Sequence, residues 1–202
     1  AGKLEDCVLL KSVALSNNQL TSLDLSGCSF LEQLYCNKNQ LTALDLTQCS
    51  SLQTLGCGQN LLTSLDLSSL TTLQELNCSS NQLTSINLTG CSSLQTIECE
   101  HNLLTSLNVS GLTSLKGLTC SSNKLTSLDL TACTSLTTLY AGTNQLTTLN
   151  LDGCVSLKSL TCGNNQLVTL DLSDCVKLES ITCNSNQLTS LDLSGCSFLE
   201  QL

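Results

Sequence analysis

A repeat of fixed length runs through this chain and constrains its fold more than any other feature. An asparagine recurs every 21 residues, with no insertion or deletion between its occurrences. A fixed period in this range is typical of a solenoid, in which each coil of the chain stacks only on its neighbours. The repeated asparagines are Asn18, Asn39, Asn60, Asn81, Asn102, Asn123, Asn144, Asn165 and Asn186.

Each 21-residue unit contains two similar halves. Leu34-Tyr35-Cys36 leads into a turn that reaches Asn39, and Leu44-Asp45-Leu46 leads into a turn that reaches Cys49. Alternation of apolar and polar residues is the pattern of a half-buried strand. We therefore expect two short strands in each coil, on a first and a second face, and two short parallel β-sheets around a leucine core. Since neither face is wider than the other, this β-solenoid should be straight or weakly curved.

The period also predicts the domain organisation. It spans nearly the whole chain, so we interpret residues 1–202 as a single solenoid of between nine and ten coils without recognisable caps. Residues 18–34 recur without change as residues 186–202, which indicates recent duplication or deliberate construction. Solenoids normally need polar caps for solubility. Three interpretations stay open: a fragment of a longer array, an engineered scaffold, or a structural unit that associates with itself end to end.

The repeated asparagine is predicted to be structural. Stacked amides can bond to each other and to the turn carbonyls of the next coil, and so satisfy backbone groups that a buried turn would leave unpaired. The exposed position just before each asparagine varies from coil to coil, and holds residues as different as His101 and Thr143. We expect the asparagines to form a ladder along the rod.

The charge of the chain excludes several partners. The formal net charge is −9, from seven lysines and no arginine against sixteen acidic residues. Nucleic acid and anionic membrane surfaces both demand clustered cations. No apolar run approaches the ~18 residues needed to span a bilayer. We therefore expect no nucleic-acid partner and no membrane insertion.

The complete pattern Leu-x-x-Leu-x-Cys-x-x-Asn-x-Leu-Thr-x-Leu-Asp-Leu-Ser-x-Cys resembles the leucine-rich repeat family. More narrowly, it is similar to the nested 21-residue class found largely in bacteria, the IRREKO type, over about residues 4–202. The resemblance implies a protein–protein interaction module, with adhesion or host interaction among bacterial members, and a secreted or cell-surface location. Cys49 departs from the pattern, because the family often has asparagine at this position.

The fifteen cysteines fall into two columns of the repeat, represented by Cys36 and Cys49. Leu70 and Leu112 take cysteine positions in the second column, and leucine cannot replace one end of a bridge or a metal ligand. We interpret the columns as ladders of buried free thiols, since free cysteine packs as a small apolar group. Some disulfides, or a metal site, are less favoured alternatives, and we predict no cofactor. Free thiols are usual in a reducing compartment, so a cytoplasmic location also stays open.

The first face varies most between coils, and packing constrains its outward positions least. Tyrosine is favoured at interfaces because it offers a large contact area and a hydroxyl group. The alternative is neutral variation on a solvated sheet. Our hypothesis is a protein-binding surface formed by Tyr35, Glu98, Glu100, His101 and Tyr140.

The second face carries an acidic column of six aspartates, interrupted by three asparagines. Neighbouring carboxylates ~5 Å apart repel by roughly 0.8 kcal/mol in water. Calcium bound between coils could relieve the repulsion, but we favour satisfaction by hydroxyl groups and solvent. The column is Asp24, Asp45, Asp66, Asn87, Asn108, Asp129, Asn150, Asp171 and Asp192.

One short segment, Glu98-Cys99-Glu100-His101, has residue types found in catalytic or metal sites. Strand alternation directs Cys99 inward and the two glutamates outward, so a cysteine–histidine pair cannot form. The chain has no second histidine to complete a metal set. We therefore predict that the protein is not an enzyme and has no catalytic residue.

Overall fold

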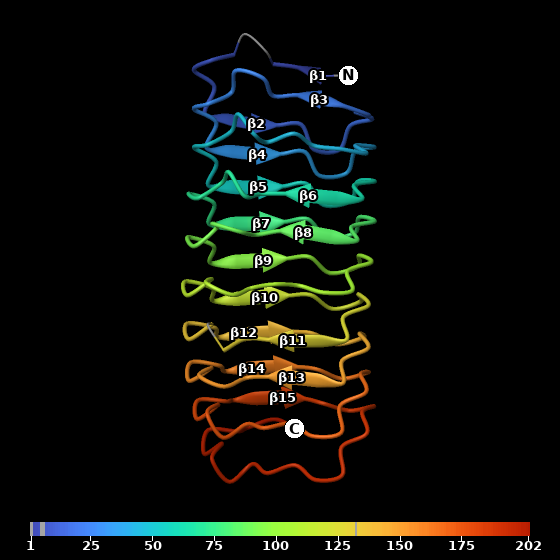
Figure 1. The fold of residues 1–202 in the computed structure, drawn as a ribbon, viewed down its shortest axis with the longest axis vertical. Helices are drawn as coiled ribbons and strands as arrows, with labels where there is room; N and C mark the ends of the chain where they lie inside the picture. Colours follow the sequence, from blue (N-terminus) through green and yellow to red (C-terminus); the bar gives the residue numbers. More distant parts are fainter. Residues whose placement is uncertain (1, 5–6, 132) are drawn as a thin grey trace.

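The fold is a rod of stacked coils. The structure is a computed structural model that describes residues 2–4, 7–131 and 133–202. Successive coils lie one above the other along a single long axis, which is straight in the view of Figure 1, and the two termini lie toward opposite ends. No helix occurs among the described residues. The expected β-solenoid is confirmed.

A continuous parallel sheet forms the first face. Each strand pairs with the strand 21 residues further on, so that Leu34 faces Leu55, and Leu55 faces Leu76. Within the described residues, nine strands join in this order along the rod: β2 (Ser12–Ala14), β4 (Gln33–Tyr35), β5 (Thr54–Gly56), β7 (Glu75–Asn77), β9 (Thr96–Glu98), β10 (Gly117–Thr119), β12 (Thr138–Tyr140), β14 (Ser159–Thr161) and β15 (Ser180–Thr182).

The second face differs in detail from the expected second sheet. In the described part of the chain its strands occur only as three separate pairs. These pairs are β1 (Gly2–Lys3) with β3 (Leu23–Asp24), β6 (Ser64–Asp66) with β8 (Ser85–Asn87), and β11 (Ser127–Asp129) with β13 (Thr148–Asn150).

The acidic column explains part of this interruption. In the pair β6–β8 the Asn87 Nδ2 donates to Asp66 Oδ1 at 3.0 Å, so the amide draws the two strands together. Another aspartate is the neighbour in the column of each of Asp45, Asp171 and Asp192, and none of these three residues lies in a strand. Repulsion between facing carboxylates opposes close pairing of their strands. The gaps from Asn87 to Asn108, from Asn108 to Asp129 and from Asn150 to Asp171 are not explained by charge.

Leucine and cysteine fill the space between the faces. Leu34 and Cys36 are fully buried, and Tyr35 between them is exposed, as strand alternation requires. Thirteen of the fifteen cysteines are buried, and all fifteen are free thiols. Burial of each leucine contributes about 1.5–3 kcal/mol. The core is therefore a stack of similar apolar layers, each completed by the coils on either side.

The asparagine ladder ties each coil to the coil before it. Asn60 Nδ2 donates to the Cys57 carbonyl in its own coil and to the Cys36 carbonyl in the preceding coil, both at 3.0 Å. Asn60 Oδ1 accepts a hydrogen bond from the Leu41 backbone N–H at 3.0 Å. The described ladder amides bond to backbone groups and not to one another, so the turn carbonyls are their partners and the amide-to-amide bonds considered from the sequence do not form. The ladder thus supplies the turn with the partners that its buried backbone needs.

The turn before each ladder asparagine has one residue in the left-handed conformation. None of these residues is glycine, and their φ angles lie between 54° and 59°. This conformation costs an ordinary L-residue about 1–2 kcal/mol, and asparagine tolerates it best. The position therefore varies in sequence but not in backbone conformation. The residues are Asn17, Lys38, Gln59, Ser80, His101, Ser122, Thr143, Asn164 and Ser185.

Thr143→Asn is expected to stabilise the protein by about 1 kcal/mol. Thr143 is β-branched and exposed with φ at 55°, a conformation that asparagine adopts at lower cost. Asn164 is the matched control, because it already occupies the equivalent turn and Asn164→Thr should lower stability by a similar amount. Urea unfolding followed by circular dichroism measures both. Equal stability of Thr143→Asn and the parent chain would show that the turn imposes no such cost.

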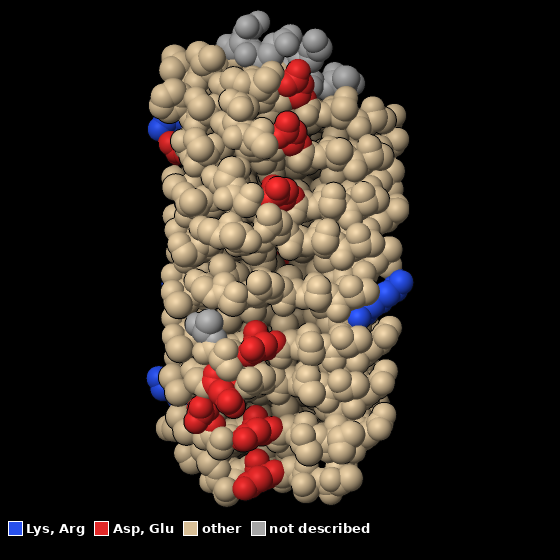
Figure 2. Space-filling model, in the orientation of Figure 1, with Lys and Arg blue, Asp and Glu red and all other residues tan. Residues whose placement is uncertain are grey.

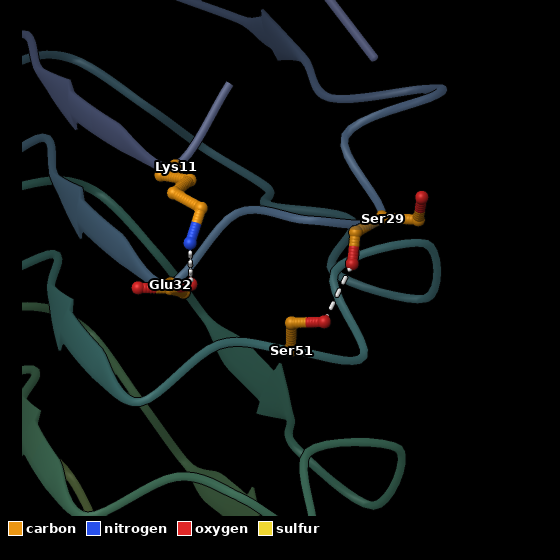
Figure 3. Close-up of polar contacts among 4 residues, drawn as sticks. All are labelled: Lys11, Ser29, Glu32 and Ser51. Atoms are coloured by element: carbon orange, nitrogen blue, oxygen red, sulfur yellow. Dashed lines mark hydrogen bonds and ion pairs between the residues drawn. The ribbon is translucent and has the colours of Figure 1, made fainter. Parts of the chain in front are cut away.

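Polar side chains on the edges add contacts between coils, as Figure 3 shows. Lys11 Nζ lies 2.8 Å from Glu32 Oε1, one coil further on. Ser51 Oγ donates to the Ser29 carbonyl at 2.8 Å. Exposed ion pairs of this kind contribute about 0–1 kcal/mol. The core and the asparagine ladder therefore dominate the cohesion of the rod.

Candidate protein-binding face

The outward side of the nine-stranded sheet, which we call the first face, is the candidate site. Its central column runs Ala14, Tyr35, Gly56, Asn77, Glu98, Thr119, Tyr140, Thr161 and Thr182. No described segment lies over this column, since each strand contacts only its neighbours in the stack. The first face is therefore open to a partner along the described part of the rod.

The structure places three of the five predicted binding residues in that one column. Tyr35 ends β4, Glu98 ends β9 and Tyr140 ends β12, and all three are exposed. The register brings Tyr35 and Glu98 within three coils of each other, and Tyr140 follows two coils later. At ~4.8 Å per strand the two tyrosines lie roughly 24 Å apart. A partner must span several coils to contact both rings.

Glu100 and His101 lie beside this column. Cys99 is fully buried between Glu98 and Glu100, which agrees with the expected strand alternation. Glu100 is half-buried, and its Oε2 atom has no hydrogen-bond partner among the described residues. His101 is exposed in the left-handed turn with φ at 55°. Their assignment to a binding surface remains a prediction.

A hollow of about 200 Å³ opens on the first face at Gly56. Tyr35 and Asn77 bound it along the rod, since they precede and follow Gly56 in the column. Glu75 and Glu98 also line it. The predicted binding residues did not include Gly56, although a glycine between a tyrosine and an asparagine in one outward column signals a gap between side chains.

The environment of Glu98 is electrostatically negative. Burial raises the pKa of the Glu98 carboxyl group, and the charges of Glu100 and then Glu75 raise it further. A hydrogen bond from the Asn77 side-chain amide acts in the opposite direction. Three columns of side chains point outward from the first face: the central column and the columns of Glu75 and Glu100 on either side of it. They contain these three glutamates and no lysine or arginine. A positively charged group would therefore be attracted to this part of the face.

The second face carries a line of aspartates. Figure 2 shows acidic side chains in a line along the rod, with further ones beside this line in the lower part of the view and an interruption in the middle, where the column holds asparagine. Asp45 Oδ1 accepts hydrogen bonds from the Thr47 backbone N–H at 3.0 Å and the Thr47 hydroxyl at 2.7 Å. These bonds hold the pKa of Asp45 below its usual value. The turn thus supplies hydrogen-bond donors to one oxygen of the Asp45 carboxylate, which is the role that we expected hydroxyl groups to have in this column.

No metal centre is evident. Among the described residues, no group of three or more histidine, cysteine, aspartate or glutamate side chains has an arrangement that could hold a metal ion. Deeply buried thiols are also unsuited to nucleophilic chemistry: burial raises the pKa of Cys36, Cys120 and Cys162 to about 12. Since the thiolate is the reactive form, these groups are inert packing atoms at neutral pH.

Residues 2–4, 7–131 and 133–202 contain no helix that is long and apolar enough to cross a bilayer.

Comparison with known proteins identifies the repeat. The sequence profile described as Leucine Rich repeats (2 copies) matches residues 113–153. A second profile, described as Leucine Rich Repeat, matches residues 72–94 and 187–202. No curated protein matches the chain.

Solved structures share the whole fold. The functional domain of InlJ from Listeria monocytogenes, which includes a cysteine ladder, superposes with a TM-score of 0.92 at 36% identity, over 97% of this chain and 44% of that chain. The leucine-rich effector protein YopM from Yersinia pestis gives a TM-score of 0.77 at 32% identity, over 90% of this chain and 51% of that chain.

The leucine-rich repeat protein LIC12759 from Leptospira interrogans shares the fold, with a TM-score of 0.70 at 24% identity over 95% of this chain and 60% of that chain. The present chain therefore spans less than two thirds of each of these three solved chains. The 21-residue coils, the profiles and the bacterial structures agree with one another. The chain belongs to the leucine-rich repeat family and is of the bacterial class with 21-residue repeats and a cysteine ladder.

Proposed function

We propose that this chain is a protein-binding module that engages its partner through the first face. Leucine-rich repeat domains generally act as binding scaffolds, which supports the general role. One observation carries the choice of face: both tyrosines of the chain are exposed in the central column of the open sheet, and Tyr35 lines the hollow at Gly56. Exposed tyrosines supply much of the binding energy at protein interfaces.

Selection of peptides from a random phage-displayed library tests the assignment. We expect the selected peptides to lose about tenfold or more in affinity for Tyr35→Ala or Tyr140→Ala, because truncation of an anchoring aromatic typically costs about 2 kcal/mol. Ser64→Ala and Ser127→Ala, on the second face, are the controls and should leave affinity unchanged. Peptides that are insensitive to the tyrosine variants but lose affinity with the serine variants would overturn the choice of face.

Self-association is the second candidate function, and exposed apolar side chains favour it. Val155, Val176 and Phe198 are exposed by 46%, 44% and 63%, and neighbouring positions of the repeat bring them to one edge of the rod. Light scattering behind size exclusion, over a concentration series under reducing conditions, separates the two roles. The binding module is expected to keep the mass of one chain. A mass that grows with concentration would favour the structural role.

The same proposal includes location. The similarity to bacterial leucine-rich repeat proteins supports a bacterial protein that is secreted or displayed at the cell surface. Thirteen of the fifteen thiols are buried, and buried thiols are protected in an oxidising environment as well as in a reducing one. The free cysteines therefore do not oppose an external location.

A further inference from the structure

The hollow at Gly56 results from one missing side chain. Four residues of neighbouring strands stand in register, in the order Tyr35, Gly56, Asn77 and Glu98. Three of them project side chains from the sheet. The Tyr35 ring, the Asn77 side chain and the Asn37 amide bound a hollow of about 200 Å³ beside Gly56, and the Asn37 amide takes part of the space that a side chain of Gly56 would fill.

Backbone conformation does not account for this glycine. The φ angle of Gly56 is not positive, so an L-residue could adopt its backbone conformation. Space is what a side chain would lack, because a Cβ atom on Gly56 would lie 2.6 Å from Asn37 Nδ2 and 3.3 Å from Tyr35 Cδ1. Any side chain at this position would occupy the hollow or displace its walls.

One side of the hollow is held in a fixed negative arrangement. Asn77 Nδ2 donates to the Glu98 carboxylate, while Asn77 Oδ1 accepts from the Ser79 backbone N–H at 3.1 Å and the Ser79 hydroxyl at 2.8 Å. The Glu98 carboxylate is therefore fixed beside the opening. Glu75 lines the same hollow from β7.

No cation of the described chain neutralises these two carboxylates. Neither Glu75 nor Glu98 forms an ion pair with a described residue. Lysines occur in the column at the edge of the first face, where each has a partner of its own: Lys11 with Glu32, Lys116 with Gln95 and Lys158 with Glu179. The hollow is therefore complementary in charge to a cation supplied from outside.

We propose that the hollow at Gly56 receives an arginine side chain of a protein partner, with its guanidinium group against the Tyr35 ring and hydrogen-bonded to the carboxylates of Glu75 and Glu98. A guanidinium group is planar, stacks on aromatic rings and pairs with carboxylates through two parallel hydrogen bonds. This inference rests on the proposed function and specifies the partner: a protein segment with an exposed arginine that lies along the first face.

Titration of the ¹⁵N-labelled chain with N-acetyl-arginine amide tests the inference directly. We expect saturable shifts of the backbone amide resonances of Gly56, Asn77 and Glu98. Glu98→Gln and Tyr35→Leu should each weaken binding about fivefold or more, since each removes one wall of the site. Gly56→Ala should do the same by filling the hollow. N-acetyl-lysine amide should bind more weakly, because an ammonium group cannot form the two parallel bonds.

Gly117→Ala is the matched control for Gly56→Ala. Gly117 lies on the same face in β10, and its Cβ atom would meet only Thr96 Cγ2 at 3.7 Å, so binding should be unchanged. Glu179→Gln removes a carboxylate that is already paired with Lys158 and should also bind normally. Shifts that are equal with the neutral N-acetyl-citrulline amide, or unaffected by both Glu98→Gln and Gly56→Ala, would overturn the inference.

The two proposals fail in different ways. Library peptides that depend on Tyr140 while arginine amide does not bind would retain the first face as the binding surface and remove arginine as its ligand. Arginine amide that binds normally while library peptides ignore both tyrosines would leave a cation pocket without support for the wider binding face.

Discussion

The protein is expected to lose its fold steeply between about pH 9 and pH 10, after nearly constant stability between about pH 5 and pH 8. The cause is the column of buried thiols on the first-face side of the core. Burial raises the pKa of Cys36, Cys120 and Cys162 to about 12 and raises the pKa of Cys57, Cys78 and Cys99 well above its usual value.

The direction follows from proton binding. A thiol whose pKa is raised on folding keeps its proton in the folded state and loses it more readily in the unfolded state. Its contribution to stability is complete below the unfolded pKa of 9.0 and falls as pH rises toward the folded pKa. At one pH unit above the unfolded pKa each such thiol costs about 1.4 kcal/mol, so six thiols cost on the order of 8 kcal/mol. That loss is comparable with the whole stability of many domains.

Cysteine-to-alanine variants provide the control, because Ala141 already replaces cysteine in the same column. Urea unfolding at a series of pH values gives the slope of stability against pH. Each replacement, such as Cys99→Ala, should reduce this slope above pH 9 by about 1.4 kcal/mol per pH unit, whatever it does to stability at pH 7. A slope that is the same in the parent and in a variant with three replacements would show that the thiols are not the cause.

Asn60→Ala is expected to destabilise the protein by roughly 2–5 kcal/mol. Asn60 is 6% exposed, and its amide bonds to four backbone groups in two coils. The Leu41 N–H would be left buried without this partner. The Cys36 and Cys57 carbonyls would keep one ladder amide each, from Asn39 and Asn81. The free energy of unfolding from urea titration at pH 7 measures the loss.

Two variants distinguish the hydrogen bonds from the loss of side-chain volume. Asn60→Asp keeps the shape and the acceptor but replaces the amide donor by a carboxylate that faces two carbonyls, so it should destabilise at least as much as Asn60→Ala. Asn18→Ala should cost less, because Asn18 is exposed and, among the described residues, its Nδ2 bonds only to the Leu15 and Ser16 carbonyls of its own coil. An Asn60→Asp variant as stable as the parent would contradict the ladder.

Sequence reasoning succeeded where one coil determines the outcome. The alternation of Leu34, Tyr35 and Cys36 predicts which side chains enter the core, and the 21-residue period predicts which coils stack. The left-handed turn was missed because residues as different as His101 and Thr143 occupy it, and no glycine marks it.

Features that depend on two coils at once were harder to predict. Part of the interruption of the second sheet depends on whether a carboxylate meets another carboxylate or an amide in the next coil, as Asp66 meets Asn87. The hollow at Gly56 depends on how the side chains of Tyr35 and Asn77 stand on either side of it. Such features require the distances between neighbouring coils, which the periodicity of one strand does not contain.

The constant offset between paired residues has a kinetic consequence. The strand and ladder bonds of Asn60 and its neighbours join residues 19 to 24 positions apart, at every level of the rod. The entropy lost on closing each such loop is therefore the same in every coil and does not grow with the length of the array. Folding can begin at any adjacent pair of coils and extend in both directions. We infer that adding repeats would lengthen the rod without slowing the formation of its first pair of coils.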